Sequence, residues 1–167
     1  MAKIVTDSSA LILLSKCGLI KELCNSFDVY SPPSVISEVA SDEIVEIYPD
    51  AAIVAELVSN QKIRLQDPVT AKLKLPMTLH QGEKDALFLA LNLKRTIFST
   101  DDKKAIKAAK FFNLPFIITP KIVVDLFKLK TISFTKARRS IEKLGVIGRY
   151  SPDIIANVLI ALSEEIK

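Results

Sequence analysis

The feature that most constrains the fold of this chain is a regular alternation of short strand-like runs with helical segments. Such an alternation is typical of parallel sheets, because parallel neighbours are joined by crossover helices that cover both faces of the sheet. It predicts an α/β fold, a three-layer α/β/α sandwich with a central, mostly parallel sheet. The predicted strands centre on residues 4–6, 29–30, 63–65, 96–100 and 116–118.

Apolar periodicity and capping residues predict helices between these strands. Ser8 or Ser9 can cap the first helix, and Thr119-Pro120 can cap the helix after the last strand. Residues 41–50 are acidic and are expected to be exposed. No repeat or linker divides the chain, so residues 1–167 are expected to form one domain. The helices are predicted over residues 10–18, 19–27, 51–59, 83–93, 133–144 and 152–166, and from residues 32, 101 and 119 onwards.

The net charge of +4 divides unevenly along the chain. Residues 103–149 hold 12 Lys or Arg and two acids, which gives +10, whereas the rest holds 11 basic and 17 acidic residues, which gives −6. A basic segment suits the phosphate backbone of a nucleic acid. The alternative is that these charges belong to solvated helix faces, and charge alone does not separate the two interpretations.

Several other classes of protein are disfavoured. The longest apolar run is far shorter than the roughly 20 residues of a membrane helix, and the first residues lack the apolar region of a signal peptide, so a cytoplasmic protein is expected. Cys17 and Cys24 have no matching His cluster for zinc and are expected to be free thiols. With His80 as the one histidine, and with no P-loop or dinucleotide fingerprint, catalytic triads and nucleotide-binding loops have little support.

The acidic residues fall at informative positions. Asp7 follows the first predicted strand, and Asp101 and Asp102 follow the strand at 96–100. Ligands of open parallel sheets bind outside the carboxyl ends of the strands, so these side chains are expected to converge there. Three further acids stand near helix starts: Glu38, Glu83 and Asp85.

Each acid also has a purely structural interpretation. Carboxylates are favoured in the first turn of a helix, and Asp7 or Asp101 could simply cap the helix that follows. A converging set is less easily explained that way, because like charges about 4 Å apart repel by roughly 4 kcal/mol near a protein surface. Such a cluster needs protons or a cation, and oxygen ligands alone favour Mg²⁺ or Mn²⁺ over zinc.

Four segments, taken in order, resemble the PIN-domain family of metal-dependent ribonucleases. Residues 4–9 resemble the first strand and its acid, and residues 32–39 resemble the helix that carries the second acid. Residues 82–90 resemble the Gly-Glu-x-x-Ala helix with the third acid, and residues 99–109 resemble the strand and helix with the fourth. The helices from about residue 133 resemble the extra C-terminal helices of some prokaryotic PIN proteins.

The resemblance implies a Rossmann-like sandwich with one or two Mg²⁺ or Mn²⁺ ions that activate water against an RNA phosphodiester. Asp85 competes with Glu83 as a ligand, because two helical positions are about 200° apart, and Asp102 competes with Asp101. Glu83 and Asp101 are preferred on the motif match and on position. The implied main ligands and catalytic residues are Asp7, Glu38, Glu83 and Asp101.

The resemblance also suggests residues for substrate contact. A hydroxyl of Ser8 or Thr100 could orient a ligand or bind substrate, although Ser8 could equally be a helix cap. Lys103 and Lys104 open the basic segment directly after the acids and are expected to contact RNA.

The expected function is therefore a metal-dependent endoribonuclease acting on single-stranded RNA, of the kind found as toxins of toxin–antitoxin pairs. A toxin of this kind is usually held by an antitoxin protein and forms a homodimer. The main alternative is a PIN-like module that binds nucleic acid or protein without cleaving it. A receiver-type signalling domain is a weaker alternative, because the first strand ends in one acid followed by serines.

Overall fold

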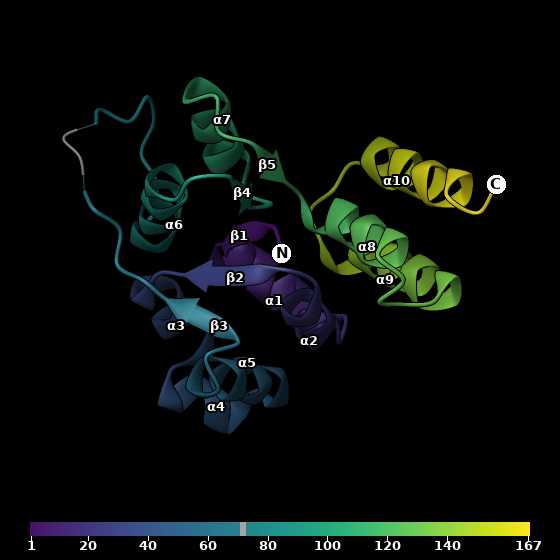
Figure 1. The fold of residues 1–167 in the computed structure, drawn as a ribbon, viewed down its shortest axis with the longest axis horizontal. Helices are drawn as coiled ribbons and strands as arrows, with labels where there is room; N and C mark the ends of the chain where they lie inside the picture. The colour runs from purple at the N-terminus through teal and green to yellow at the C-terminus, as the bar shows by residue number, and fades with distance from the viewer. Residues whose placement is uncertain (71–72) are drawn as a thin grey trace.

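A computed structural model, which describes residues 1–70 and 73–167, has a five-stranded sheet at its centre (Figure 1). All neighbouring strands are parallel, and their order across the sheet is β3-β2-β1-β4-β5. The predicted strands are all present, and the sheet is wholly parallel. Their bounds are β1 (Lys3–Thr6), β2 (Asp28–Ser31), β3 (Ile63–Leu65), β4 (Thr96–Ser99) and β5 (Phe116–Ile117).

Helices connect the strands and follow the last one. Each predicted helix is present, with ends that differ from the expected ones by a few residues. Their bounds are α1 (Ser8–Lys16), α2 (Ile20–Ser26), α3 (Pro33–Ala40), α4 (Asp42–Ile47), α5 (Pro49–Ser59), α6 (Gln81–Asn92), α7 (Lys103–Phe111), α8 (Thr119–Lys128), α9 (Phe134–Ile147) and α10 (Pro152–Glu164).

The helices form the outer two layers of a sandwich. On one side α6 packs against β1 and β4, and α7 packs against α6. On the other side α2 packs against β2 and α5 against β3, so α6 and α1–α2 lie on opposite sides of the sheet (Figure 1). This confirms the three-layer α/β/α fold class predicted from the alternation of elements.

The strand order creates a switch point beside β1. The chain moves from β1 outward to β2 and β3, then returns through α6 to place β4 on the other side of β1. Thr6 of β1 is in register with Ser99 of β4, so both strands end at the same level. Their following residues, Asp7 and Thr100, therefore meet at the crevice where ligands of such sheets bind.

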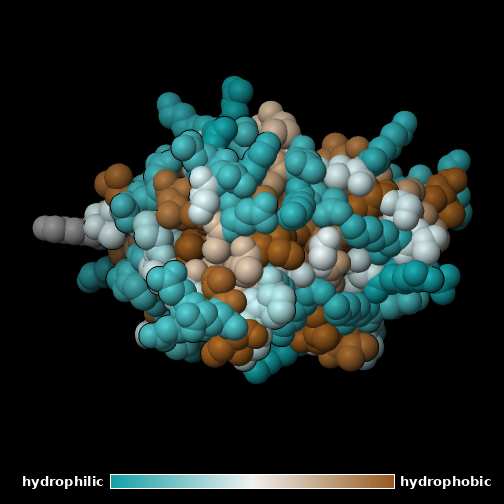
Figure 2. Space-filling view, turned by 90° about the horizontal axis from the view of Figure 1, so that it is seen from below, coloured by the Kyte–Doolittle hydropathy of each residue, from teal (hydrophilic) through white to brown (hydrophobic). Residues whose placement is uncertain are grey.

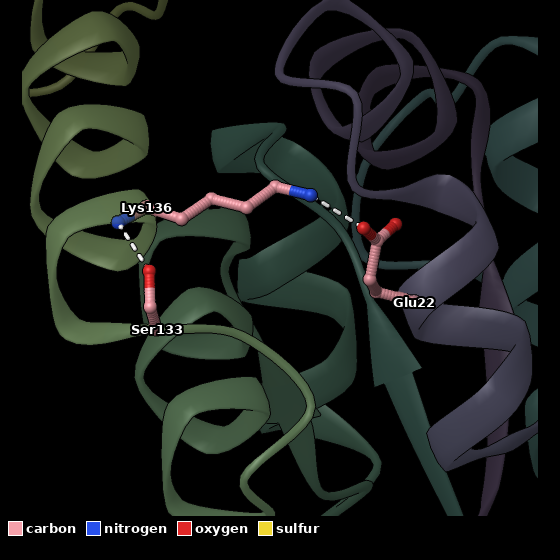
Figure 3. A network of polar contacts seen from close by, with 3 residues as sticks. All are labelled: Glu22, Ser133 and Lys136. Carbon is pink, nitrogen blue, oxygen red and sulfur yellow. Dashed lines mark hydrogen bonds and ion pairs between the residues drawn. The ribbon is translucent and has the colours of Figure 1, made fainter.

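The last three helices form a group of their own beside the sheet. α8, α9 and α10 pack against one another, and α8 contacts α1 and α2 (Figure 1). An ion pair between Lys136 of α9 and Glu22 of α2 adds a polar tie, and the backbone N–H of Lys136 donates to the capping hydroxyl of Ser133 (Figure 3). The core nevertheless continues through this group, from Ile4 to Leu162.

Two details of the sequence analysis need correction. Residues 41–50 are largely exposed, as expected, but they contain the short helix α4, which the pattern did not predict and none of whose residues is buried. Its acidic first turn, Asp42 and Glu43, stabilises a helix even though the pattern has no core-facing stripe. The cap of α1 is Asp7 and not Ser8 or Ser9, because the Asp7 carboxylate accepts the N–H of Ala10.

The surface seen from below carries separate apolar patches among hydrophilic groups (Figure 2). Among the residues described, no helix is both long and apolar enough to cross a membrane. Cys17 and Cys24 are both free thiols, as expected, and burial raises the pKa of Cys24 to about 11.

Candidate active site

Asp7 lies at the centre of the predicted site and has no exposed surface. Its Oδ1 accepts two hydrogen bonds, from the N–H of Ala10 at 3.0 Å and from the hydroxyl of Ser9 at 2.8 Å. Its Oδ2 accepts a bond from the hydroxyl of Thr100, the residue that follows β4. Burial outweighs these bonds and raises the pKa of Asp7 to about 7.

Asp101 is held by residues from the last helices. Its Oδ1 accepts the N–H of Thr119 at 2.8 Å and the phenol of Tyr150, and its Oδ2 accepts the hydroxyl of Thr119 at 2.6 Å. Its own N–H donates to Ser9 at 3.1 Å, which links the ends of β1 and β4. Burial raises the pKa of Asp101, and burial together with the Asp101 charge raises the pKa of Tyr150, so the phenol stays a donor.

The two aspartates share one pattern of hydrogen bonds. In each, Oδ1 accepts two donors and Oδ2 accepts one, from a threonine hydroxyl. A carboxylate oxygen has two lone pairs, so Oδ1 is fully engaged while Oδ2 keeps one lone pair. Both side chains are thus oriented by the protein and each retains one acceptor position.

Glu38 joins the site from the neighbouring helix α3. Its carboxylate accepts the hydroxyl of Ser8, the residue next to Asp7. It also lies directly over Gly82, where an added Cβ would come 2.5 Å from the Glu38 Oε1. The glycine in the predicted Gly-Glu motif therefore leaves room for this carboxylate, which a larger residue would displace.

Asp85 and Glu83 lie in different surroundings on α6. The Glu83 carboxylate accepts the N–H of His80 at 3.1 Å and so caps its own helix. The Asp85 carboxylate accepts the hydroxyl of Ser34 on α3 at 2.6 Å. Ser34 and Glu38 are four residues apart and share a face of α3, so Asp85 and Glu38 belong to the same contact between α3 and α6.

Asp102 and the lysines after it lie at the start of α7. Asp102 is the N-cap and accepts the N–H of Ala105 at 2.8 Å, which corrects the expectation that Asp101 starts this helix. Lys103 and Lys104 are exposed. They stand at the positive end of the helix dipole, where basic residues are normally disfavoured.

The hydroxyls proposed for substrate contact point to carboxylates instead. Thr100 has no exposed surface and donates to Asp7, while Ser8 is half-buried and donates to Glu38. Both hydroxyls therefore orient a carboxylate, which is one of the two roles expected for them; the other was contact with substrate. A cavity of about 270 Å³ opens beside Glu38 and extends past Tyr48.

Sequence reasoning missed Ser9, Thr119 and Tyr150 as parts of this site. The sequence predicts Ser9 and Thr119 only as helix caps, although their positions next to strand ends are a signal for this site. Tyr150 carries no such signal, because 49 residues separate it from Asp101.

The donor set suits a hard divalent cation in kind, because it consists of carboxylate oxygens with acceptor positions left over. Within residues 1–70 and 73–167, no three Asp, Glu, His or Cys side chains are gathered into a formed metal centre. The side chains would therefore have to close around a cation. Glu38, Asp85 and the free lone pairs of Asp7 and Asp101 are the donors best placed to do so.

Comparison with known proteins supports a family assignment. A family model described as a PIN domain matches residues 3–165, nearly the whole chain. Curated proteins give no match. PIN domains are generally nucleases and typically use divalent metal ions, which fits an acidic site at a sheet edge. The chain belongs to the PIN-domain family.

Proposed function

We propose that this protein is a metal-dependent endoribonuclease that hydrolyses phosphodiester bonds of single-stranded RNA, with Mg²⁺ or Mn²⁺ as cofactor. One observation carries the proposal. The buried Asp7 and the half-buried Asp101 are linked through Ser9 at the switch point of the sheet, and each keeps a single lone pair on the oxygen that a threonine orients. Burial raises the pKa of both carboxylates, so their ionised forms are costly in the metal-free protein and a nearby cation would offset that cost.

We assign Asp7, Glu38 and Asp101 as the main ligands of the cation. For the fourth acid the contacts favour Asp85 over Glu83, because Glu83 is bonded to the start of its own helix while Asp85 shares the α3–α6 contact with Glu38. Asp102 caps α7 and is the weaker alternative to Asp101.

A bound Mg²⁺ or Mn²⁺ would supply Lewis-acid polarisation of the phosphodiester and an activated water. The protein's own part is positioning. Thr100 and Thr119 hold the two aspartates, and exposed cations surround the site at the starts of α7 and α8 and between α9 and α10. These cations are available to hold the RNA backbone on either side of the bond to be cut: Lys103, Lys104, Lys121 and Arg149.

The experiment is cleavage of a labelled single-stranded RNA with Mg²⁺, Mn²⁺ or EDTA. The wild type should cleave with either metal and lose activity in EDTA, and Asp7→Asn should lose at least about a hundredfold in rate because a cation ligand is gone. Asp28→Asn is the matched control, since Asp28 starts β2 at the opposite edge of the sheet and pairs with Arg64. Cleavage that survives both EDTA and Asp7→Asn would refute the proposal.

The same samples test the alternative of a non-cleaving module. Binding of RNA that weakens with salt, with no product in any metal, would favour a binding protein over a nuclease.

We further propose that the protein acts in the cytoplasm as the toxin of a toxin–antitoxin pair and forms a homodimer. The free thiols suit a reducing compartment, and α10 leaves Ile154 and Ile160 exposed, which suits a protein contact.

Light scattering should give twice the mass of the chain. Growth arrest on expression, relieved by Asp7→Asn or by a protein encoded beside the gene, should follow. A monomer that leaves growth unaffected would contradict this proposal.

A further inference from the structure

We infer that Tyr150 is a positioning residue of the active site, which orients the Asp101 carboxylate for the cation. This inference rests on the proposed function, because it assigns a role to Asp101 as a ligand. It extends the site beyond the four acidic motifs to the segment between α9 and α10.

Gly148 leaves the space that the Tyr150 ring occupies. A Cβ added to Gly148 would lie 2.2 Å from Cε2 and 2.6 Å from Cδ2 of the Tyr150 ring. The ring therefore packs against the backbone of Gly148, and this brings the phenol to the Oδ1 of Asp101. Any side chain at position 148 would push the ring out of this position.

Tyr150 and Thr119 hold Asp101 from two directions. Thr119, the first residue of α8, donates to both carboxylate oxygens, and Tyr150 adds the second donor to Oδ1. With two donors on Oδ1, the acceptor position that stays open is on Oδ2. The phenol thus decides which oxygen Asp101 can offer.

The segments that carry these donors are anchored to the rest of the protein. α8 packs on α1 and α2, and α9 is tied to α2 through Lys136 and Glu22 (Figure 3). The hydrogen bonds to Asp101 therefore depend on how the last helices dock. Partners of a ligating carboxylate in a metal site typically change metal affinity 10- to 100-fold when removed.

The test measures Mn²⁺ binding by titration calorimetry on the full chain. Tyr150→Phe removes one donor and keeps the ring, and it should weaken Mn²⁺ binding by about tenfold or more. Gly148→Ala keeps the phenol but displaces it, and should weaken binding in the same direction. Tyr30→Phe and Gly145→Ala are matched controls, since the Tyr30 phenol accepts a bond from Arg64 of β3 and a Cβ at Gly145 would meet Ile155 at an ordinary 3.5 Å.

Thermal unfolding in EDTA separates positioning from folding. Tyr150→Phe is the primary variant, because a Cβ at Gly148 would also come 2.8 Å from the carbonyl oxygen of Leu144. Weaker Mn²⁺ binding by Tyr150→Phe, with a well-folded protein and unchanged controls, supports the inference. Wild-type affinity in Tyr150→Phe overturns it and leaves the proposed function intact, whereas a wild type that binds no Mn²⁺ overturns both.

Discussion

At the scale of single residues, Asp7 shows the conflict between stability and function. The carboxylate is fully buried and accepts three hydrogen bonds, yet none of the ion pairs among residues 1–70 and 73–167 involves it. Burial raises its pKa to about 7 from an ordinary value of 3.8. Ionisation of Asp7 therefore costs more in the folded, metal-free protein than in the unfolded chain, and a bound cation would offset that cost.

This predicts how the stability of the metal-free protein varies with pH. An acid whose pKa is higher in the folded state contributes stability below its unfolded pKa, and this contribution is lost as pH rises to the folded pKa. The free energy of unfolding in EDTA should fall between about pH 4 and pH 7, by up to about 1.4 kcal/mol per pH unit from this residue. Urea titrations across this range measure it, and a rise towards pH 7 would contradict the prediction.

Asp7→Asn isolates the contribution of that residue. The amide oxygen can keep the bond from Ala10, and the Thr100 hydroxyl can turn to accept from the amide NH₂. At pH 8 in EDTA the variant should be more stable than the wild type by about 1 kcal/mol or more, although it should not cleave RNA. Its unfolding free energy should also depend less on pH than that of the wild type, and an unchanged pH dependence would argue against Asp7 as the source.

At the scale of elements, helix contacts depend on small residues at the crossing of α3 and α6. Gly82→Ala would place a Cβ 2.5 Å from the Glu38 carboxylate, which must then move. Alanine also favours the helix by about 1 kcal/mol, so the fold should persist. We expect RNA cleavage to fall at least about tenfold while the melting temperature stays near that of the wild type. Unchanged cleavage would separate Glu38 from the chemistry, and Gly145→Ala again serves as the control.

The elements themselves were largely predictable from the sequence. Apolar runs such as Ile4-Val5 and the periodicity of the helices indicate which residues are buried. Asp7 and Asp101 follow the ends of two strands, so the order of the elements along the chain was enough to predict that both lie at one edge of the sheet. What the sequence could not supply was the direction of each side chain. Glu83 matched the motif but caps its helix, and Asp85 faces α3 because of packing between elements distant in the chain.

At the scale of the whole molecule, the structure shows where the basic residues of segment 103–149 lie. Lys103 and Lys104 stand beside the acidic site at a helix end where the dipole disfavours them. A local conflict of this kind is a common sign of function. In contrast Lys136, equally part of the basic segment, is used in the ion pair with Glu22. Only part of the charge of residues 103–149 is therefore free to bind the RNA proposed as substrate.

A double replacement tests this division of charge. Lys103→Ala with Lys104→Ala should weaken RNA binding and lower the slope of log affinity against log salt by about 1.4, since each phosphate contact on a single strand adds roughly 0.7. Lys62→Ala with Lys94→Ala removes the same charge near the amino ends of β3 and β4, on the opposite edge, and should leave the slope unchanged. Equal effects of the two pairs would mean that net charge, and not position, governs binding.

The contact between Asp101 and Tyr150 also has a consequence for the order in which the protein is made. A ribosome adds the 49 residues from Asp101 to Tyr150 in roughly 2 to 10 seconds. During that interval the nascent chain already carries every acidic motif, but the phenol that completes the hydrogen bonds of Asp101 does not yet exist. The hydrogen bonds that hold Asp101 are therefore completed only after the segment between α9 and α10 has been synthesised.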